Sequence, residues 1–139
     1  MLDNNRMKHS VGVGKKMKKL AGEISPGDKD FEQDMFLLGL LHDIGYEFSS
    51  EQDEHAQTGG NALRMNGYKY WKEIFYHGKP NAEYSSEALK ILNIADLLTD
   101  AQGNEVSAKD RLLDVMGRYG KDSTQYKEFE KLAKEVKLM

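Results

Sequence analysis

The hydrophobic positions of this chain recur at helical spacing almost throughout. The first predicted helix runs from about residue 3 to residue 22. Its apolar arc is formed by two rows of residues three or four positions apart, which are Met7, Val11, Gly14 and Ala21, and His9, Val13, Met17 and Leu20. Lysines occupy the opposite arc at positions 8, 15, 16 and 19, so we expect His9 at the edge of the buried face.

The same periodicity predicts the rest of the chain as helices. The second helix is expected from Asp28 or Asp30 to about Phe48, and further helices at about 54–65, 68–78, 85–100, 107–120 and 123–139. Only two prolines occur, both between periodic segments, and β-branched residues never alternate over the length of a strand. We therefore expect an all-α, single-domain helical bundle of about six to seven helices over residues 1–139, completed by the helices of 106–139.

Composition narrows the class of protein. The chain has 139 residues and no cysteine, which excludes disulfides and thiolate metal sites and is typical of a reducing cytoplasm. The formal net charge of -3 lacks the basic excess of most nucleic-acid binders, so no nucleic acid duplex is expected as a partner. No apolar run approaches the roughly 20 residues of a membrane span, so no membrane partner is expected either. The expected oligomeric state is a monomer or a homodimer.

A polar pair interrupts the most apolar stretch, "LLGLLHDIGYEF" at residues 37–48. Met35, Leu38 and His42 share one helical line, and Gly39 and Asp43 share the next, so the pair is expected to point inward. Burying such groups costs free energy unless hydrogen bonds or another partner, such as a metal, satisfy them. The small Gly39 would let another helix approach closely.

The four histidines of the chain fall on different predicted helices, and Asp96 interrupts the apolar stripe of Leu89 and Leu92. Each has an ordinary explanation alone. A lone inward histidine is usually a core residue, a lone carboxylate can pair with a lysine, and His77 can interact with a helix C-terminus. Taken together, imidazoles and carboxylates are the ligands that remain for a metal when thiolates are absent.

The order of these residues resembles the dinuclear branch of the HD-domain metal-dependent phosphohydrolases. The motifs that carry the resemblance are "MKHSVGVG", "GLLHDIG", "HAQTGG", "YHGKP" and "NIADLLTD". The resemblance implies an HD-domain fold whose ligands lie within residues 9–96 and two divalent ions from among Fe, Mn, Ni, Co, Mg and Zn. One ion would be held by His9, His42 and Asp96 and the other by His55 and His77, with Asp43 bridging. His42 and Asp43 would then lie at the catalytic centre, beside a metal-bridging hydroxide.

The implied activity is hydrolysis of a nucleotide or another small phosphate ester, and five positions are candidates for contact with this substrate. Many relatives carry lysine directly after "HDIG", where this chain has Tyr46. Lys79 lies close to His77 and is either a phosphate contact or a solvated loop lysine. Asp100 is either an orienting partner of a ligand histidine or an exposed carboxylate. Arg111 and Arg118 follow Asp96 on a helix that borders the pocket in relatives. Helical apolar spacing explains most of that helix as core, through Leu112, Leu113, Val115 and Met116.

Three functions are compatible with this pattern of residues. The first is the metal-dependent phosphohydrolase. The second is a mixed-valence diiron oxygenase, because a minority of the same family uses this ligand pattern to activate dioxygen. The third is a non-enzymatic module that binds a metal or another ligand. The chain lacks the second histidine and the GYP signature of the cyclic-dinucleotide phosphodiesterases, so that activity ranks low.

Overall fold

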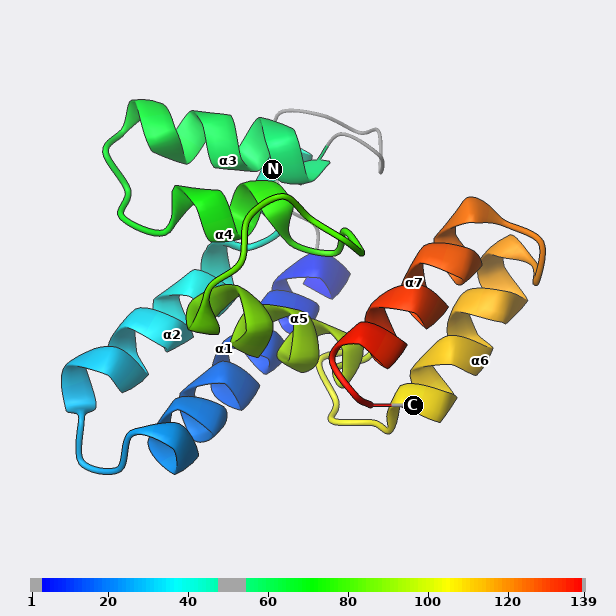
Figure 1. Cartoon of the computed structure of the whole chain (residues 1–139), viewed down its shortest axis with the longest axis horizontal. Helices are drawn as coiled ribbons and strands as arrows, with labels where there is room; N and C mark the ends of the chain where they lie inside the picture. Colours follow the sequence, from blue (N-terminus) through cyan, green and yellow to red (C-terminus); the bar gives the residue numbers. More distant parts are fainter. Residues whose placement is uncertain (1–3, 48–54, 139) are drawn as a thin grey trace.

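The computed structural model describes residues 4–47 and 55–138. Over this part of the chain the elements follow the order α1 (Asn4–Ile24), α2 (Lys29–Leu41), a 3₁₀ turn (Ile44–Glu47), α3 (His55–Met65), α4 (Trp71–Tyr76), α5 (Glu87–Leu97), α6 (Ala108–Tyr119) and α7 (Thr124–Glu135). A single isolated bridge between Thr99 and Glu105 is the only β pairing among these residues. The prediction of an all-α protein is confirmed (Figure 1).

Helices α1 and α2 lie side by side and form the base of the main core (Figure 1). They approach closely at Gly14 and Gly39, because a Cβ at Gly39 would lie 2.5 Å from the Cα of Gly14. The predicted close approach at Gly39 is therefore confirmed. Helices α4 and α5 complete this core, whose fully buried members include Val13, Met17, Met35, Leu38, Ile74 and Leu92.

The second helix ends earlier than the sequence predicts. α2 stops at Leu41, the backbone N–H of His42 donates to the Gly39 carbonyl, and the chain continues as the 3₁₀ turn. At Gly45 the turn contacts the backbone of His55 so closely that a Cβ there would overlap the His55 carbonyl. A continued helix would carry the chain away from that contact, so the predicted extension to about Phe48 is wrong. Phe48 itself lies outside the described residues.

The later helices are shorter than predicted. Ser86, Ser107 and Ser123 each accept a hydrogen bond from the backbone N–H three residues further on, and these N-caps set the starts of α5, α6 and α7. Helix α5 ends at Leu97, so the predicted helix over 85–100 is corrected to Glu87–Leu97 and a loop connects it to α6. Helix α4 covers only Trp71–Tyr76 of the predicted 68–78.

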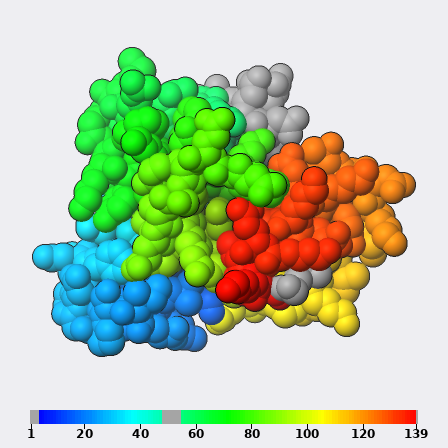
Figure 2. All heavy atoms as spheres, in the orientation of Figure 1, coloured from blue at the N-terminus to red at the C-terminus, as the bar shows by residue number. Residues whose placement is uncertain are grey.

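Helices α6 and α7 form a hairpin at one end of the molecule (Figure 1). Leu97, Leu132 and Ala133 make its small core, with Phe129 and other half-buried residues packed around them. In the space-filling view α7 lies against the segment between α4 and α5 (Figure 2), where the N–H of Asn81 donates to Glu135 Oε2 at 3.0 Å. Among the described residues, no helix is both long and apolar enough to cross a membrane.

Three residues that the spacing assigns to buried faces are exposed. Of the four apolar residues of α6 predicted as core, Leu112 and Val115 are buried, whereas Leu113 is 50% exposed and Met116 is 36% exposed. The hairpin buries one narrow face of α6, and Leu113 and Met116 lie outside it. Met7, at the start of α1, is 51% exposed because the core begins further along that helix.

Candidate metal centre

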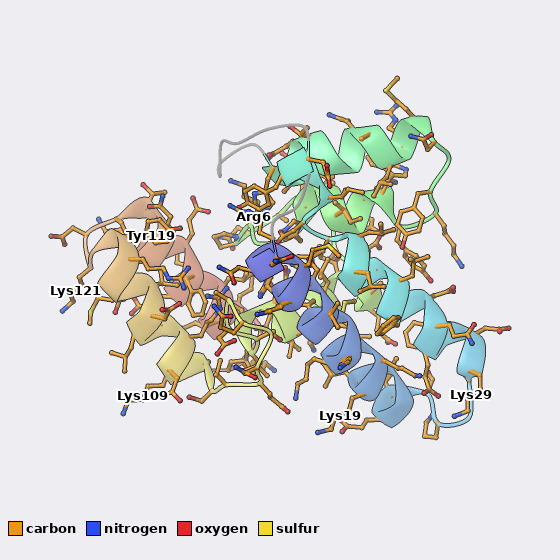
Figure 3. All side chains as sticks on the ribbon, turned by 180° about the vertical axis from the view of Figure 1, so that it is seen from behind. Arg6, Lys19, Lys29, Lys109, Tyr119 and Lys121 are labelled. Atoms are coloured by element: carbon orange, nitrogen blue, oxygen red, sulfur yellow. The ribbon has the colours of Figure 1, made fainter. Side chains whose placement is uncertain are left out.

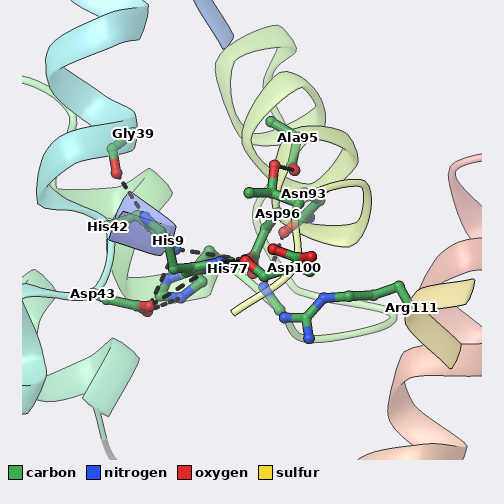
Figure 4. A network of polar contacts seen from close by, with 12 residues as sticks. His9, Gly39, His42, Asp43, His77, Asn93, Ala95, Asp96, Asp100 and Arg111 are labelled. Atoms are coloured by element: carbon green, nitrogen blue, oxygen red, sulfur yellow. Dashed lines mark hydrogen bonds and ion pairs between the residues drawn. The ribbon is translucent and has the colours of Figure 1, made fainter. Parts of the chain in front are cut away.

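The fold brings the six predicted ligands together from five parts of the chain. His9 comes from α1, His42 and Asp43 from the turn after α2, His55 from the first position of α3, His77 from the C-cap of α4, and Asp96 from the last turn of α5. Figure 4 shows most of this cluster, with the side chains directed toward one another. His42 is fully buried, and Asp43 and His77 are nearly so.

The Asp43 carboxylate lies between two groups of histidines. Its Oδ2 is 3.3 Å from His42 Nε2 and 3.9 Å from His9 Nε2. Its Oδ1 is 3.2 Å from His55 Nε2 and 3.5 Å from His77 Nε2. One carboxylate oxygen therefore faces each group, which is the arrangement that a carboxylate shared by two cations requires.

Asp96 belongs to the first of these groups. Its Oδ1 lies 2.8 Å from His9 Nε2 and 3.5 Å from His42 Nε2. Donor atoms of His9, His42 and Asp96 all lie within 4.8 Å of one another, and so do those of His42, Asp43 and His77. Both sets are compact enough for their atoms to contact a single ion.

Backbone carbonyls orient three of the imidazole rings. The Nδ1–H of His42 donates to the Gly39 carbonyl at 2.7 Å, and that of His77 donates to the Ile74 carbonyl at 2.6 Å. The Nδ1–H of His9 donates to the Asp100 carbonyl at 2.9 Å. We assign the proton to Nδ1 because a carbonyl oxygen can only accept. The Nε2 atoms are thereby directed toward the carboxylates, as metal-ligating histidines require.

The Nε2 atom of His42 provides a test of whether the cluster fits a metal. It is completely buried and has no hydrogen-bond partner among the described residues, although two carboxylate oxygens lie nearby. A buried polar atom without a partner costs roughly 1–3 kcal/mol. A divalent ion at this point would satisfy it, and nitrogen and oxygen donors suit such ions. The clustered residues therefore fit a divalent metal.

The electrostatics of the cluster favour the charged forms of His42, Asp43 and Asp96. Burial alone would lower the pKa of His42, but the negative charges of Asp43 and Asp96 raise it to about 9. Burial would raise the pKa of both carboxyls, but the imidazoles around them hold both pKa values well below the usual range. Because a metal would compete with the proton on His42 Nε2, we expect metal affinity to rise with pH.

Tyr46 stacks on a predicted ligand. Its ring lies 4.4 Å from the His55 ring, between centroids, at an interplanar angle of 11°. Burial first, and then the negative charge of Asp43, raise the pKa of Tyr46 to about 12, so its hydroxyl stays protonated at neutral pH. Tyr46 therefore supports His55 and carries no charge of its own.

Arg6 is a residue of this site that the sequence interpretation missed. Its guanidinium carbon lies 3.3 Å from the centroid of the Tyr46 ring, close enough for a cation–π interaction. Arg6 lies at the end of α1 nearest α3, whereas Lys19 and Lys29 lie at the far end of the α1–α2 pair (Figure 3). Its spacing of three residues before His9, which places it on the same helix face, was the signal that could have found it.

Asp100 contacts a predicted ligand through its backbone. Its carbonyl, not its carboxylate, accepts the hydrogen bond from His9. The carboxylate accepts instead from the backbone N–H groups of Gln102 and Asn104, both at 2.9 Å. The Asp100 carboxylate thus holds the conformation of its loop, and this conformation places the Asp100 carbonyl beside His9.

The three candidate cations for a substrate line one cavity next to the cluster. Lys79 Nζ lies 4.0 Å from Glu128 Oε2. Asp114 lies between the two arginines, 3.5 Å from Arg111 Nη1 and 3.3 Å from Arg118 Nε. Arg111 is largely buried and its Nε has no hydrogen-bond partner among the described residues, whereas Arg118 is half exposed. Contact of these side chains with a substrate stays a prediction.

The cavity has a volume of about 420 Å³ and joins the histidine–aspartate cluster to the α6–α7 hairpin. The hairpin side of its wall includes residues that the sequence interpretation did not single out: Tyr119, Thr124, Gln125, Glu128, Phe129 and Leu132. They lie more than 20 positions after Asp96, and only the folding of the hairpin onto α5 brings them there.

Comparison with known families agrees with this geometry. A model of the HD domain matches residues 6–138, nearly the whole chain. The protein therefore belongs to the HD domain family, whose members are largely metal-dependent hydrolases, and the resemblance read from the ligand order is confirmed for the family. A search of curated proteins gave no match, and neither did a search of solved structures.

Proposed function

We propose that this protein is a metal-dependent phosphohydrolase that cleaves a small phosphate ester, such as a nucleotide, with two divalent ions. The observation that carries the proposal is the position of Asp43, which presents one oxygen to His9 and His42 and the other to His55 and His77. Membership of the HD domain family supports the hydrolase class.

The ligand roles follow from the two groups. His9, His42 and Asp96 would hold one ion, His55 and His77 the other, and Asp43 would contact both. Bound ions would supply a water nucleophile that is ionised at neutral pH, together with positive charge beside the phosphate. The carbonyls behind His9, His42 and His77 keep the rings in place, so the donors need little reorganisation when ions bind.

Two guanidinium groups are suited to bind the phosphate. Arg6 and Arg111 both line the cavity, one beside Tyr46 and the other on α6. A guanidinium presents several N–H donors in a plane, which matches the oxygens of a phosphate. Figure 4 shows Arg111 extending toward Asp100 and Asp96, at the edge of the cluster.

The far wall of the cavity favours an uncharged leaving group. Its charged side chains are paired with one another, Lys79 with Glu128 and Arg118 with Asp114. Between these pairs the wall is uncharged, because Val115, Phe129 and Leu132 are apolar and Thr124 and Gln125 are neutral. The volume lies in the range of small-molecule sites. We infer a phosphate monoester of a neutral alcohol, such as a nucleoside, in preference to a di- or triphosphate.

Metal analysis combined with an activity panel tests the proposal. The protein is purified without chelator, its metals are measured by elemental analysis, and phosphate release is assayed on nucleotides and simple esters with Mn, Fe, Ni or Co. We expect phosphate release that stops on chelation and returns when metal is restored. Iron at about two per chain with oxygen uptake and no phosphate release would instead support the oxygenase. A folded protein that binds no metal would contradict the site.

A substitution in the cavity wall tests the leaving-group inference. Val115→Phe places a ring in the cavity, so we expect kcat/KM for a nucleoside monophosphate to fall about tenfold or more, and that for glycerol phosphate to change less than about threefold. Leu113→Phe is the matched control, because Leu113 is 50% exposed on the same helix and does not line the cavity. Equal losses on both substrates would contradict the inference.

A further inference from the structure

The loop between α5 and α6, residues 98–106, is closed by its own hydrogen bonds, and we call it the clasp loop. The N–H of Asp100 donates to the Asn104 carbonyl at 2.9 Å, and the N–H of Val106 donates to the Leu98 carbonyl at 2.8 Å. The Thr99 hydroxyl donates back to the Ala95 carbonyl at 2.7 Å, and Thr99 is almost completely buried. The base of the clasp loop is thus attached to the last turn of α5.

The tip of the clasp loop packs on α1 through two glycines. A Cβ on Gly12 would overlap the backbone of Gly103, and a Cβ on Gly103 would overlap the Lys8 carbonyl. Gly103 also has φ of +84°, a conformation that glycine adopts at little cost. Lys16 and Glu105 form an ion pair beside this contact. The loop and the helix therefore meet backbone to backbone.

Asp100 holds the loop together and also contacts the metal centre. Its carboxylate accepts from the N–H groups of Gln102 and Asn104. Its carbonyl accepts from the Gly103 N–H at 3.0 Å and from His9 Nδ1 at 2.9 Å. The carboxylate thus fixes the turn that aims the carbonyl at His9.

His9 differs from the other oriented histidines in the origin of its acceptor. His42 and His77 donate to carbonyls only three residues earlier in their own segments, so local backbone geometry orients them. The acceptor for His9 lies 91 residues away in the chain. The orientation of the His9 ring therefore depends on the docking of the clasp loop on α1.

We propose that the clasp loop positions His9 for metal binding. Asp100 is the positioning residue, and the Gly12–Gly103 contact holds the loop against α1. The inference rests on the metal site of the proposed function. An outer hydrogen bond to a ligand histidine typically accounts for 10–100-fold in metal affinity, and the clasp loop supplies this bond to His9.

Gly12→Ala tests the contact that holds the clasp loop against α1. Alanine favours a helix more than glycine does, so the substitution leaves α1 intact while its Cβ pushes the loop away. We expect Mn²⁺ affinity, measured by calorimetric titration, to fall about tenfold or more. Gly22→Ala is the matched control on the same helix, because its Cβ would meet only the Glu32 side chain at 3.6 Å. Its Mn²⁺ affinity should equal that of the unchanged protein.

Asp100→Ala and Asp100→Asn test the positioning residue. Alanine removes the acceptor for Gln102 and Asn104, whereas the asparagine Oδ1 can still accept from both N–H groups. We expect Asp100→Ala to lower Mn²⁺ affinity about tenfold or more, and Asp100→Asn to restore most of it. Nitrogen-15 spectra of the protein should show the Nδ1–H of His9 in a hydrogen bond with the Asp100 carbonyl, and should show this hydrogen bond lost in Asp100→Ala and Gly12→Ala.

The nitrogen-15 measurement separates this inference from the proposed function. A protein without phosphatase activity whose His9 Nδ1–H signal still responds to both substitutions would overturn the function and support the clasp loop. Unchanged His9 signals and Mn²⁺ affinity in both Gly12→Ala and Asp100→Ala would overturn the clasp loop, whatever the activity.

Discussion

Replacing Asp43 with asparagine is expected to lower kcat/KM for a phosphate monoester by about 10⁴-fold. The substitution keeps the shape of the side chain but replaces one carboxylate oxygen with an NH₂ group, which cannot bind a cation. Since one oxygen faces His9 and His42 and the other faces His55 and His77, either orientation of the amide deprives one group of its shared ligand.

Activity and metal content of the Asp43→Asn variant should fall together. The measurement is steady-state kinetics beside elemental analysis, with circular dichroism to verify that the helices are retained. Asp28→Asn is the matched control: Asp28 caps the start of α2, and asparagine caps a helix about as well as aspartate. Undiminished turnover by Asp43→Asn would exclude the shared-carboxylate mechanism.

Replacing Gly45 with alanine is expected to lower the free energy of unfolding by about 3 kcal/mol or more. The added Cβ would overlap the His55 carbonyl, and neither backbone can move without shifting the 3₁₀ turn or the start of α3. Because His55 is a predicted ligand and Asp43 lies two residues before Gly45, Mn²⁺ affinity should fall as well.

Urea unfolding measures the effect of Gly45→Ala on stability. Gly117→Ala on α6 is the control, since the Cβ that it adds would meet no atom within 4 Å beyond the backbone of its own helix and the adjacent residues. Alanine there should raise the free energy of unfolding by up to about 1 kcal/mol, because it is the better helix former. A Gly45→Ala variant as stable as the unchanged protein would show that the turn and α3 are not in tight contact.

Helical periodicity predicted the helices well and their ends poorly. The apolar spacing of α1, α2 and α5 reports which face is buried, because each packs one broad face into the main core. It failed after Leu41, where contact between Gly45 and His55 ends the helix. It also failed on α6, since spacing cannot show that the hairpin leaves Leu113 and Met116 exposed.

The candidate ligands could be predicted from residue types and their order, whereas the other groups of the site could be recognised only in the three-dimensional structure. Arg6 and the far wall of the cavity were missed, because their relation to the histidines arises from packing between distant helices. Asp100 was singled out as an orienting residue, but its contact with His9 runs through the backbone carbonyl, which every residue possesses. A side-chain pattern carries no information about such a bond.

The all-α class, the HD family and the candidate metal ligands could be predicted from the sequence, because they depend on residue types, their local spacing and their order along the chain. The folded structure was needed to show which oxygen of Asp43 faces which histidines, which carbonyl orients His9, and which residues enclose the cavity. These features depend on contacts between segments far apart in the chain. Their geometry is set by close backbone approaches, such as those at Gly12, Gly39 and Gly45, that no local pattern reveals.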